Sequence, residues 1–424
     1  MTAYAVSVPG EKPVRAPTKT NAPPVRSALR DIPRSVWVLG FVSMLMDISS
    51  EMIHALLPVY LVAGLGVSML TVGFIEGVAE ATAAIVKVFS GVLADYWGRR
   101  KPLLVLGYGM AAFTKPIFAL ATTVGWLVAA RFIDRVGKGI RGAPRDALLA
   151  DLAPAHLRGA SFGLRQSLDT VGAFVGPLLA MALMWFTADH YTTVFWVAVV
   201  PAFLSFALIA LAVREPARVA DAQPARSPLS RAQLSRLGRA YAGVVVVGAV
   251  LTLARFSEAF LILKAQSEGL AATWVPLVLV GMNVVYAVAA YPLGALSDRM
   301  NRTHLLEAGV LLLIAGDAVL AWWPGLMGVA VGVLLWGLHM AMTQGLLAAL
   351  VADTAPAELR GTAFGFFNLV SGLAMLAASV IAGALWDGLG AQATFLTGGL
   401  FALIAWVGLV VRRKGGSTQI KTLS

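Results

Sequence analysis

The sequence contains no cysteine and few charged side chains. Without cysteine, the protein has no disulfide bond, no thiolate nucleophile and no thiolate metal site. Only 13% of its 424 residues are charged, whereas a soluble protein of this length carries about a quarter. The composition is 58% hydrophobic, and the mean hydropathy is +0.79. These values predict an integral membrane protein that is surrounded mostly by lipid.

Motifs of ATP-driven and hydrolytic proteins are also missing. The sequence has no phosphate-binding Gly-x-x-x-x-Gly-Lys-Ser/Thr run and no Gly-x-Ser-x-Gly nucleophile motif. The glycine-rich run GKGIRG, at 137–142, falls inside an expected membrane helix. Five scattered histidines argue against a dedicated metal site, although a carboxylate-rich site would still accept a metal. We therefore expect no enzymatic activity and no bound cofactor.

Long apolar stretches fill most of the chain, and each is long enough to cross a bilayer as a helix. There are twelve, near 36–62, 69–94, 102–120, 124–150, 157–185, 191–213, 241–266, 273–297, 303–323, 325–352, 359–386 and 392–411. None shows the alternating pattern of a membrane β-barrel strand. The sequence thus predicts an all-α membrane protein with twelve transmembrane helices.

Lysine and arginine gather in alternate loops. They occupy the tail before residue 35, the loop at 99–101, the middle loop 214–240, the loop at 299–302 and the C-terminal tail. Basic loops stay on the cytoplasmic side, so both termini are expected in the cytoplasm. The net charge of +11 then sets the orientation of the chain and gives no reason to expect a nucleic-acid partner. The first 34 residues have no continuous apolar stretch, so we expect a disordered tail and no signal peptide.

The second part of the chain repeats the first. The run ADLAPAHLRGASFG at 150–163 matches ADTAPAELRGTAFG at 352–365 in ten of fourteen positions. A second match, with an almost equal offset, relates the run that begins at Gly91 to the run that begins at Gly294. We therefore predict two six-helix bundles, 35–213 and 241–412, joined by a cytoplasmic linker at 214–240 and followed by a tail at 413–424. Parallel halves of this kind place a substrate site between them, near the middle of the membrane.

The run GVLADYWGRRK, at 91–101, resembles the most specific motif of the major facilitator superfamily, a family of twelve-helix transporters. The resemblance extends over residues 35–412, and the second copy keeps the motif more weakly, with Asn301 in place of Gly98. It implies a conformational latch formed by Gly91, Asp95, Gly98, Arg99, Arg100 and Arg145. A simpler interpretation is that the cations only retain this loop in the cytoplasm; the two interpretations are compatible.

Ionisable side chains inside the membrane are rare and usually functional. Here they concentrate in the first half, where several recur at helical spacing. The candidate substrate- or proton-binding residues are Asp47, Glu51, Glu80, Asp134, Arg135, Lys138, Arg165 and Asp169. An alternative for some is structural, since Arg165 and Asp169 lie one turn apart and would neutralise each other.

The fifth helix resembles the motif of proton-coupled antiporters in the same superfamily. Gly172, Gly176 and Pro177 match it, while Ala180 and Met181 replace its last two glycines. A generic kink formed by small residues is the alternative. In the fourth helix, Lys138 replaces the glutamine of the exporter pattern, and a positive stripe in a cavity attracts anions.

These features together predict a monomeric secondary transporter of the bacterial inner membrane, most simply a proton-coupled exporter of a small anionic or zwitterionic molecule. An acid of the first helix, Asp47 or Glu51, or the Asp134–Arg135 pair would exchange the proton. The alternatives are a proton symporter or anion exchanger that imports a metabolite, a membrane receptor that transports nothing, and a protein that moves lipid. The sequence does not identify the substrate.

Overall fold

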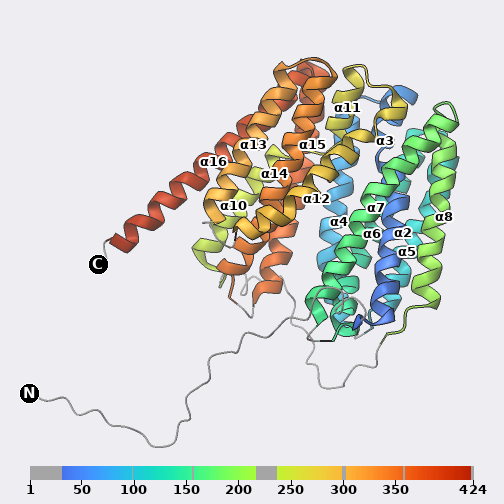
Figure 1. Cartoon of the computed structure of the whole chain (residues 1–424), viewed down its shortest axis with the longest axis horizontal. Helices are drawn as coiled ribbons and strands as arrows, with labels where there is room; N and C mark the ends of the chain where they lie inside the picture. The colour runs from blue at the N-terminus through green and yellow to red at the C-terminus, as the bar shows by residue number, and fades with distance from the viewer. Residues whose placement is uncertain are drawn as a thin grey trace, which may run out of the picture.

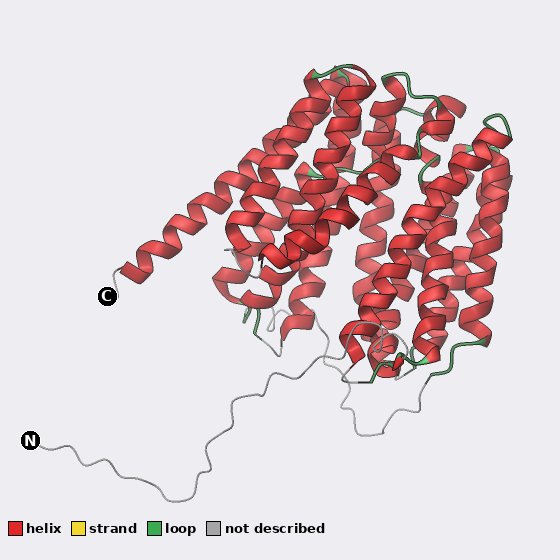
Figure 2. Ribbon diagram, viewed as in Figure 1, coloured by secondary structure: helices red, strands yellow, loops and turns green. Residues whose placement is uncertain are grey.

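The computed structural model describes residues 31–97, 99–154, 157–215, 236–297, 302–356 and 359–421. All regular secondary structure in these ranges is helical (Figure 2). The first half contains α2 (Arg34–His54), α3 (Leu57–Val59), η1 (Tyr60–Gly64), α4 (Met69–Trp97), α5 (Lys101–Leu120), α6 (Val124–Leu152), α7 (Arg158–Phe186) and α8 (Tyr191–Leu211). The second half contains α10 (Gly238–Ala254), α11 (Ala259–Ser267), η3 (Ala272–Trp274), α12 (Leu277–Ser297), α13 (Arg302–Trp322), α14 (Gly325–Thr354), α15 (Arg360–Leu389) and α16 (Ala391–Lys421).

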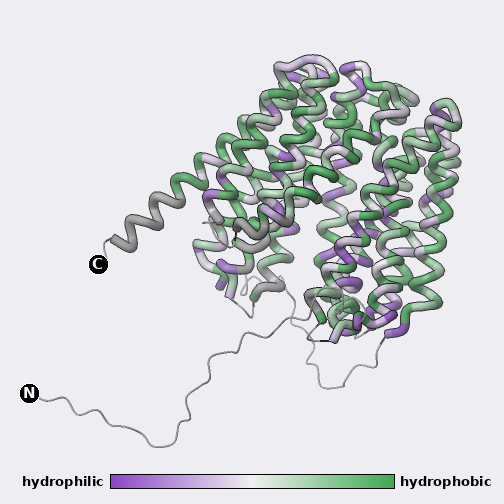
Figure 3. Tube along the Cα trace, in the orientation of Figure 1, coloured by the Kyte–Doolittle hydropathy of each residue, from purple (hydrophilic) through white to green (hydrophobic). Residues whose placement is uncertain are grey.

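All twelve predicted stretches are helical, which confirms the predicted fold class. Eleven spans within the described ranges are long and apolar enough to cross a membrane. Helix α6 is the stretch that does not qualify, because arginine, lysine and aspartate recur along it. Most of the described tube is hydrophobic, and hydrophilic stretches interrupt the helices of the first half (Figure 3). The protein is therefore a multi-pass membrane protein in which the charged helix must be shielded by its neighbours.

Two predicted helices are interrupted. The first stretch breaks after α2, near Pro58, which lacks the N–H group that a continuous helix needs. The seventh stretch is confirmed as a span over Gly238–Ser267, but it is not one continuous helix: α10 ends at Ala254 and α11 begins at Ala259. The intervening residues include neither glycine nor proline. Tertiary contacts stabilise the break, since the Ser257 N–H donates to Ser379 Oγ at 3.3 Å.

The helices form two bundles that lie side by side (Figure 1). The first bundle contains α2 to α8 and the second contains α10 to α16; α4 packs against α15 and α7 against α12 across the boundary. We call the face where α2 and α10 begin and α6, α8 and α14 end the terminal face, which is lower in Figure 1. The other end of the bundles is the opposite face.

Apolar packing joins the two halves at the opposite face. One buried cluster there combines Leu61 and Met184 of the first half with Ala259 and Leu263 of α11. At the terminal face, one cluster contains only residues of the first half, from Ile32 to Val213. Another contains only residues of the second half, from 237 to 363. The halves are thus packed together at one end and have separate cores at the other.

Candidate functional site

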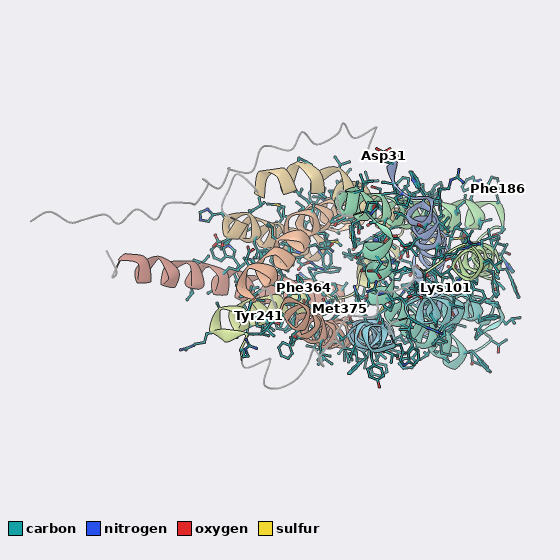
Figure 4. All side chains as sticks on the ribbon, turned by 90° about the horizontal axis from the view of Figure 1, so that it is seen from below. Asp31, Lys101, Phe186, Tyr241, Phe364 and Met375 are labelled. Carbon is teal, nitrogen blue, oxygen red and sulfur yellow. The ribbon has the colours of Figure 1, made fainter. Side chains whose placement is uncertain are left out.

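A cavity of about 520 Å³ lies between the two halves. Its lining residues come from the middle of the helices and from the parts nearer the terminal face. Polar residues of both halves contribute: Asp47, Glu80, Lys87, Lys138, Arg141 and Arg145 from the first, and Arg255, Gln344, Asn368 and Ser371 from the second. Figure 4 shows the molecule from this face and labels two apolar lining residues, Phe364 and Met375, on α15.

A second cavity, of about 260 Å³, continues the first toward the opposite face. The two cavities share Glu80, Lys138, Arg255 and Met375 as lining residues. The deeper cavity is more acidic, and its lining also includes Glu51, His54, Glu76, Phe256, Ser257, Glu258, Asn283 and Trp336. All four residues between α10 and α11 therefore line it. A non-helical backbone at membrane depth is tolerated where it borders a cavity, which fits this position.

Direct contacts close the opposite face. The carboxylate of Asp387, on α15, accepts the backbone N–H groups of Met69 at 2.9 Å and Leu70 at 2.8 Å, at the start of α4. Thr273 donates its hydroxyl to Asp189 Oδ1 at 2.5 Å, again between the halves. Access to the cavities is therefore blocked from this side, which is one of the states that alternating access requires.

Buried ion pairs connect α4 with α6 in the first half. Arg131 donates to Glu76 Oε2 at 2.7 Å, and the side chains of both residues are almost completely buried. His54 lies between this glutamate, at 3.7 Å, and Glu51, at 3.3 Å. Charges inside a membrane protein are stable when they are paired in this way. Glu76 and Arg131 thus hold the helices together while Glu51 remains at the cavity wall.

A second group of charges links α5, α6 and α4. Lys115 donates to Asp134 Oδ1 at 2.9 Å, and Arg135 donates to Glu80 Oε1 at 3.2 Å. The predicted Asp134–Arg135 pair is formed at 3.7 Å, but Lys115 is the closer partner of Asp134. The Glu80 side chain is 38% exposed, against 3% for Arg135. Glu80 therefore presents a carboxylate to the cavity, and Arg135 holds it from behind.

A third group lies nearer the terminal face. Arg165 donates to Asp169 Oδ2 at 2.5 Å within α7, as the one-turn spacing suggested. Arg145 lies 3.8 Å from the same carboxylate and donates to Ser43 Oγ at 2.5 Å. Asp146 contacts both arginines, at 3.3 Å and 3.9 Å. This network connects α2, α6 and α7, and of its members only Arg145 lines a described cavity.

The glycines of α7 explain how close this helix comes to α2. A Cβ atom on Gly172 would lie 2.9 Å from Asp47 Cβ, and a Cβ atom on Gly176 would lie 2.8 Å from Glu51 Cβ. Both glycines would also clash with backbone oxygens of α2. Pro177 is buried directly after them within α7. The motif therefore packs against the part of α2 that carries the two candidate acids.

The predicted latch is only partly described. A Cβ atom on Gly91 would lie 3.2 Å from Ala143 Cβ, so α4 and α6 pack closely there. Arg99 is exposed, whereas Arg100 pairs with Asp151 and donates to Ala147 O at 2.7 Å. Gly98 and the side chain of Asp95 lie outside the described residues. The predicted contact of Asp95 with Arg145 therefore stays a prediction.

The structure divides the predicted binding residues into two groups. Asp47, Glu51, Glu80 and Lys138 line the cavities, whereas Asp134, Arg135, Arg165 and Asp169 do not. Sequence reasoning did not select Arg255, Glu258 or Asn283, which line the deeper cavity from the second half. Their signal was ionisable or polar character in otherwise apolar stretches, the same signal that identified the acids of α2. No group of three His, Asp or Glu side chains in the described ranges is arranged to hold a metal ion.

Comparison with known proteins agrees with this architecture. The profile of the Major Facilitator Superfamily matches residues 39–379 and 240–422. An uncharacterized MFS-type transporter of Methanocaldococcus jannaschii is 31% identical over 385 residues, which cover 89% of this chain and 94% of the relative. The multidrug resistance protein MdtH of Photorhabdus laumondii is 30% identical over 148 residues, 35% of this chain and 37% of the relative.

The fold agrees as well. The crystal structure of the nucleoside transporter NupG superimposes with a TM-score of 0.77 at 12% identity, covering 89% of this chain and 99% of the other. At this low sequence identity, the superposition supports a common fold and gives no information about the substrate. The profile match, the long archaeal relative and the two six-helix bundles lead to one conclusion. The chain belongs to the Major Facilitator Superfamily, a family of membrane transporters and not of enzymes.

Proposed function

We propose that this transporter is a proton-coupled exporter of small anionic or zwitterionic molecules. The observation that carries the proposal is a cavity between the halves that is closed at the opposite face and lined by Asp47, Glu80 and Lys138. A site of this kind offers groups that bind protons and a cation that binds an anion. Rocking of the halves would then expose the same groups to the other side.

Three further features support export. The antiporter-like motif of α7 packs against α2 beside Asp47 and Glu51, so it is well placed to transmit their protonation to the helix contact. A relative that matches part of the chain is a multidrug resistance protein. The lysines and arginines of alternate loops would place the terminal face in the cytoplasm of a bacterial cell. The cavity then faces the compartment from which an exporter collects its substrate.

Purified protein in vesicles, with a pH-sensitive dye enclosed and equal pH on both sides, tests the proposal. Valinomycin and potassium hold the membrane potential constant while anions, zwitterions and cations are added outside one at a time. Antiport predicts that inward movement of a substrate raises the internal pH, whereas symport lowers it. Symport would contradict the proposal and favour an importer. Solute movement without any pH change would show that transport is not coupled to protons.

The double variant Asp47→Asn/Glu51→Gln tests the proton site. We expect substrate-dependent pH change to disappear while binding of the substrate is retained, because both cavity-facing acids of α2 have lost their titratable group. Arg239→Gln is a matched control, since Arg239 is exposed at the start of α10 and lines neither cavity. Unchanged proton movement in the double variant would refute the assignment to α2.

A further inference from the structure

The break between α10 and α11 presents two opposite charges to the cavities. Arg255 lines both cavities, and Glu258 lines the deeper one, nearer the opposite face. The sequence has no glycine or proline between the two helices, so a continuous helix would be expected from the sequence alone. Discontinuous helices at the middle of the membrane form substrate sites in transporters, because their side chains and free backbone groups converge there.

Six charged residues of the cavities have no ion pair and no side-chain hydrogen bond within the described part of the chain: Asp47, Lys87, Lys138, Arg141, Arg255 and Glu258. Of these, Lys138, Arg255 and Glu258 line the deeper cavity. The other acids of the deeper cavity are already engaged, each with a basic side chain of its own half: Glu51 with His54, Glu76 with Arg131 and Glu80 with Arg135. Unpaired charges inside a membrane protein are costly and usually indicate a ligand site.

Cations predominate in the larger cavity and acids in the deeper one. Lys138, on α6, and Arg255, after α10, both line the junction of the two cavities and come from opposite halves. The larger cavity, on the terminal side, adds the cations Lys87, Arg141 and Arg145 and one further acid, Asp47, so positive charge predominates there. The deeper cavity, on the other side of the junction, contains Glu258 and the amide of Asn283. A ligand that spans the junction therefore meets positive charge at one end and negative charge at the other.

An aromatic wall lies beside the acidic end. Phe256 and Trp336 both line the deeper cavity, with their ring centroids 5.6 Å apart. The Trp336 indole donates its Nε1–H to Asp317 Oδ1 at 2.9 Å, and this bond fixes the ring from the side away from the cavity. The side chains of Phe256 and Trp336 are almost completely buried, so they form an apolar backing of the cavity. The suitability of the acidic end for a cationic group therefore comes from Glu258.

We propose that Lys138 and Arg255 bind the anionic group of an amphoteric substrate and that Glu258 binds its cationic group. The inference deepens the proposed function and rests on it for the role of the ligand as a transported molecule. Charge-assisted hydrogen bonds from Arg255 to an anion would bring together a cation of the second half and Lys138 of the first. The substrate itself would then bridge the two halves.

Calorimetric binding to the purified protein in detergent tests the inference with three probes of similar shape. These are 4-(2-aminoethyl)benzoate, which carries both charges, 4-ethylbenzoate, which is an anion, and 2-phenylethylamine, which is a cation. We expect the doubly charged probe to bind about tenfold more tightly than either analogue, because only it satisfies both ends. Equal binding of the three probes, or binding of none, would overturn the inference.

Single variants test which residue binds the carboxylate of the probes and which binds the amine. Arg255→Gln should weaken the two probes that contain a carboxylate about tenfold and leave the amine unchanged, and Arg255→Lys should restore part of the loss. Glu258→Gln should weaken the two probes that contain an amine and leave 4-ethylbenzoate unchanged. Arg239→Gln is the control for loss of a charge on α10 outside the cavities. Unfolding midpoints of all variants identify any general loss of structure, and equal weakening of all probes in a folded variant would contradict the assignment.

The binding experiment needs neither a membrane nor a gradient, so its result separates the two proposals. If the charge-specific pattern is found but vesicles show no coupled proton movement, the proposed function fails and the binding site stands. If vesicles show proton antiport of a singly charged molecule and both variants bind and transport it normally, the site assignment fails and the proposed function stands.

Discussion

The pair Lys115–Asp134 in the first half corresponds to the pair Asp317–Trp336 in the second. Both pairs join the third helix of a bundle to the fourth, both are separated by 19 residues, and both are bonded at 2.9 Å. The offset of 202 between the halves relates each residue of one pair to a residue of the other. The first half makes this contact with an ion pair, and the second makes it with a neutral indole donor.

This difference extends to the neighbouring helices. In the first half, α6 carries several charged residues whose partners lie on α4 and α5. The corresponding helix of the second half, α14, contributes His339, which contacts the carbonyl oxygen of Gly309 at 2.7 Å, and an apolar core. The first bundle therefore has buried charge pairs in addition to its apolar cores. The other is held by apolar packing, and most of its cavity charge comes from the break after α10.

The largest expected effect comes from breaking the ionic version of the contact. Lys115→Met leaves Asp134 buried next to Arg135 without its closer partner, and we expect the free energy of unfolding to fall by about 3–5 kcal/mol. Replacing both residues, as Lys115→Met/Asp134→Leu, should recover most of this loss because no unpaired carboxylate remains. Denaturant unfolding in detergent measures both variants. A single variant as stable as the wild type would mean that the ion pair does not stabilise the bundle.

A smaller effect is expected from a change at the contact of α7 with α2, where the two halves also differ. At an offset of 202, Gly176 of α7 corresponds to Ala378 of α15, so the second half already accepts a methyl group at this position. In the first half, Gly176→Ala would place Cβ 2.8 Å from Ile48 O, and we expect a loss of about 1–3 kcal/mol.

Gly163→Ala is the matched control for this variant. It lies on the same helix, and a Cβ atom there would have no atom within 4 Å. Unfolding midpoints and substrate-dependent pH changes are measured for both variants. Loss of stability in both, or in neither, would show that close contact with α2 is not what Gly176 provides.

The smallest expected effect concerns the contact between the halves. Asp387→Asn removes the charge that accepts two backbone N–H groups at the start of α4, so closure of the opposite face should weaken by about 1 kcal/mol, or roughly fivefold in population. Because the chain has no native cysteine, a single cysteine at Ala83, in the cavity, reports access to a water-soluble thiol reagent. Faster labelling from the opposite side is expected. Unchanged labelling from that side would show that other contacts determine closure.

The sequence predicts most of the fold because its signals are local. Span length, the position of basic loops and the repeated motif each depend on short segments, and the twelve helices follow from them. The same reasoning identified Asp47, Glu51, Glu80 and Lys138 as intramembrane charges, and all four line cavities. These residues can be identified from the sequence because each is an ionisable side chain within an apolar stretch.

Partnerships between helices could not be predicted in the same way. Glu76 and Arg131 are 55 residues apart, and so are Glu80 and Arg135, so only the packing of α4 on α6 reveals the two pairs. Asp134 was assigned to the site on its depth alone, and the structure places it behind the cavity wall beside Lys115. The break before α11 also had no local signal, because residues 255–258 have ordinary helix-compatible side chains and the contact of Ser257 with Ser379 is distant in sequence.

The break has a mechanical consequence. Helix α11 packs against both halves: Ala259 and Leu263 belong to the cluster that joins the halves at the opposite face, and Phe260 and Ile262 belong to the main core of the second half. The start of α10 belongs to a core of the second half alone. A rigid rod would carry a movement at one end unchanged to the other. A jointed one lets the outer segment, which contacts both halves, change its angle while the inner segment stays with the second half. Opening the opposite face would then change the distance between Arg255 and Glu258. Residues 255–258 would thus link the binding of a molecule in the cavities to the opening of the opposite face.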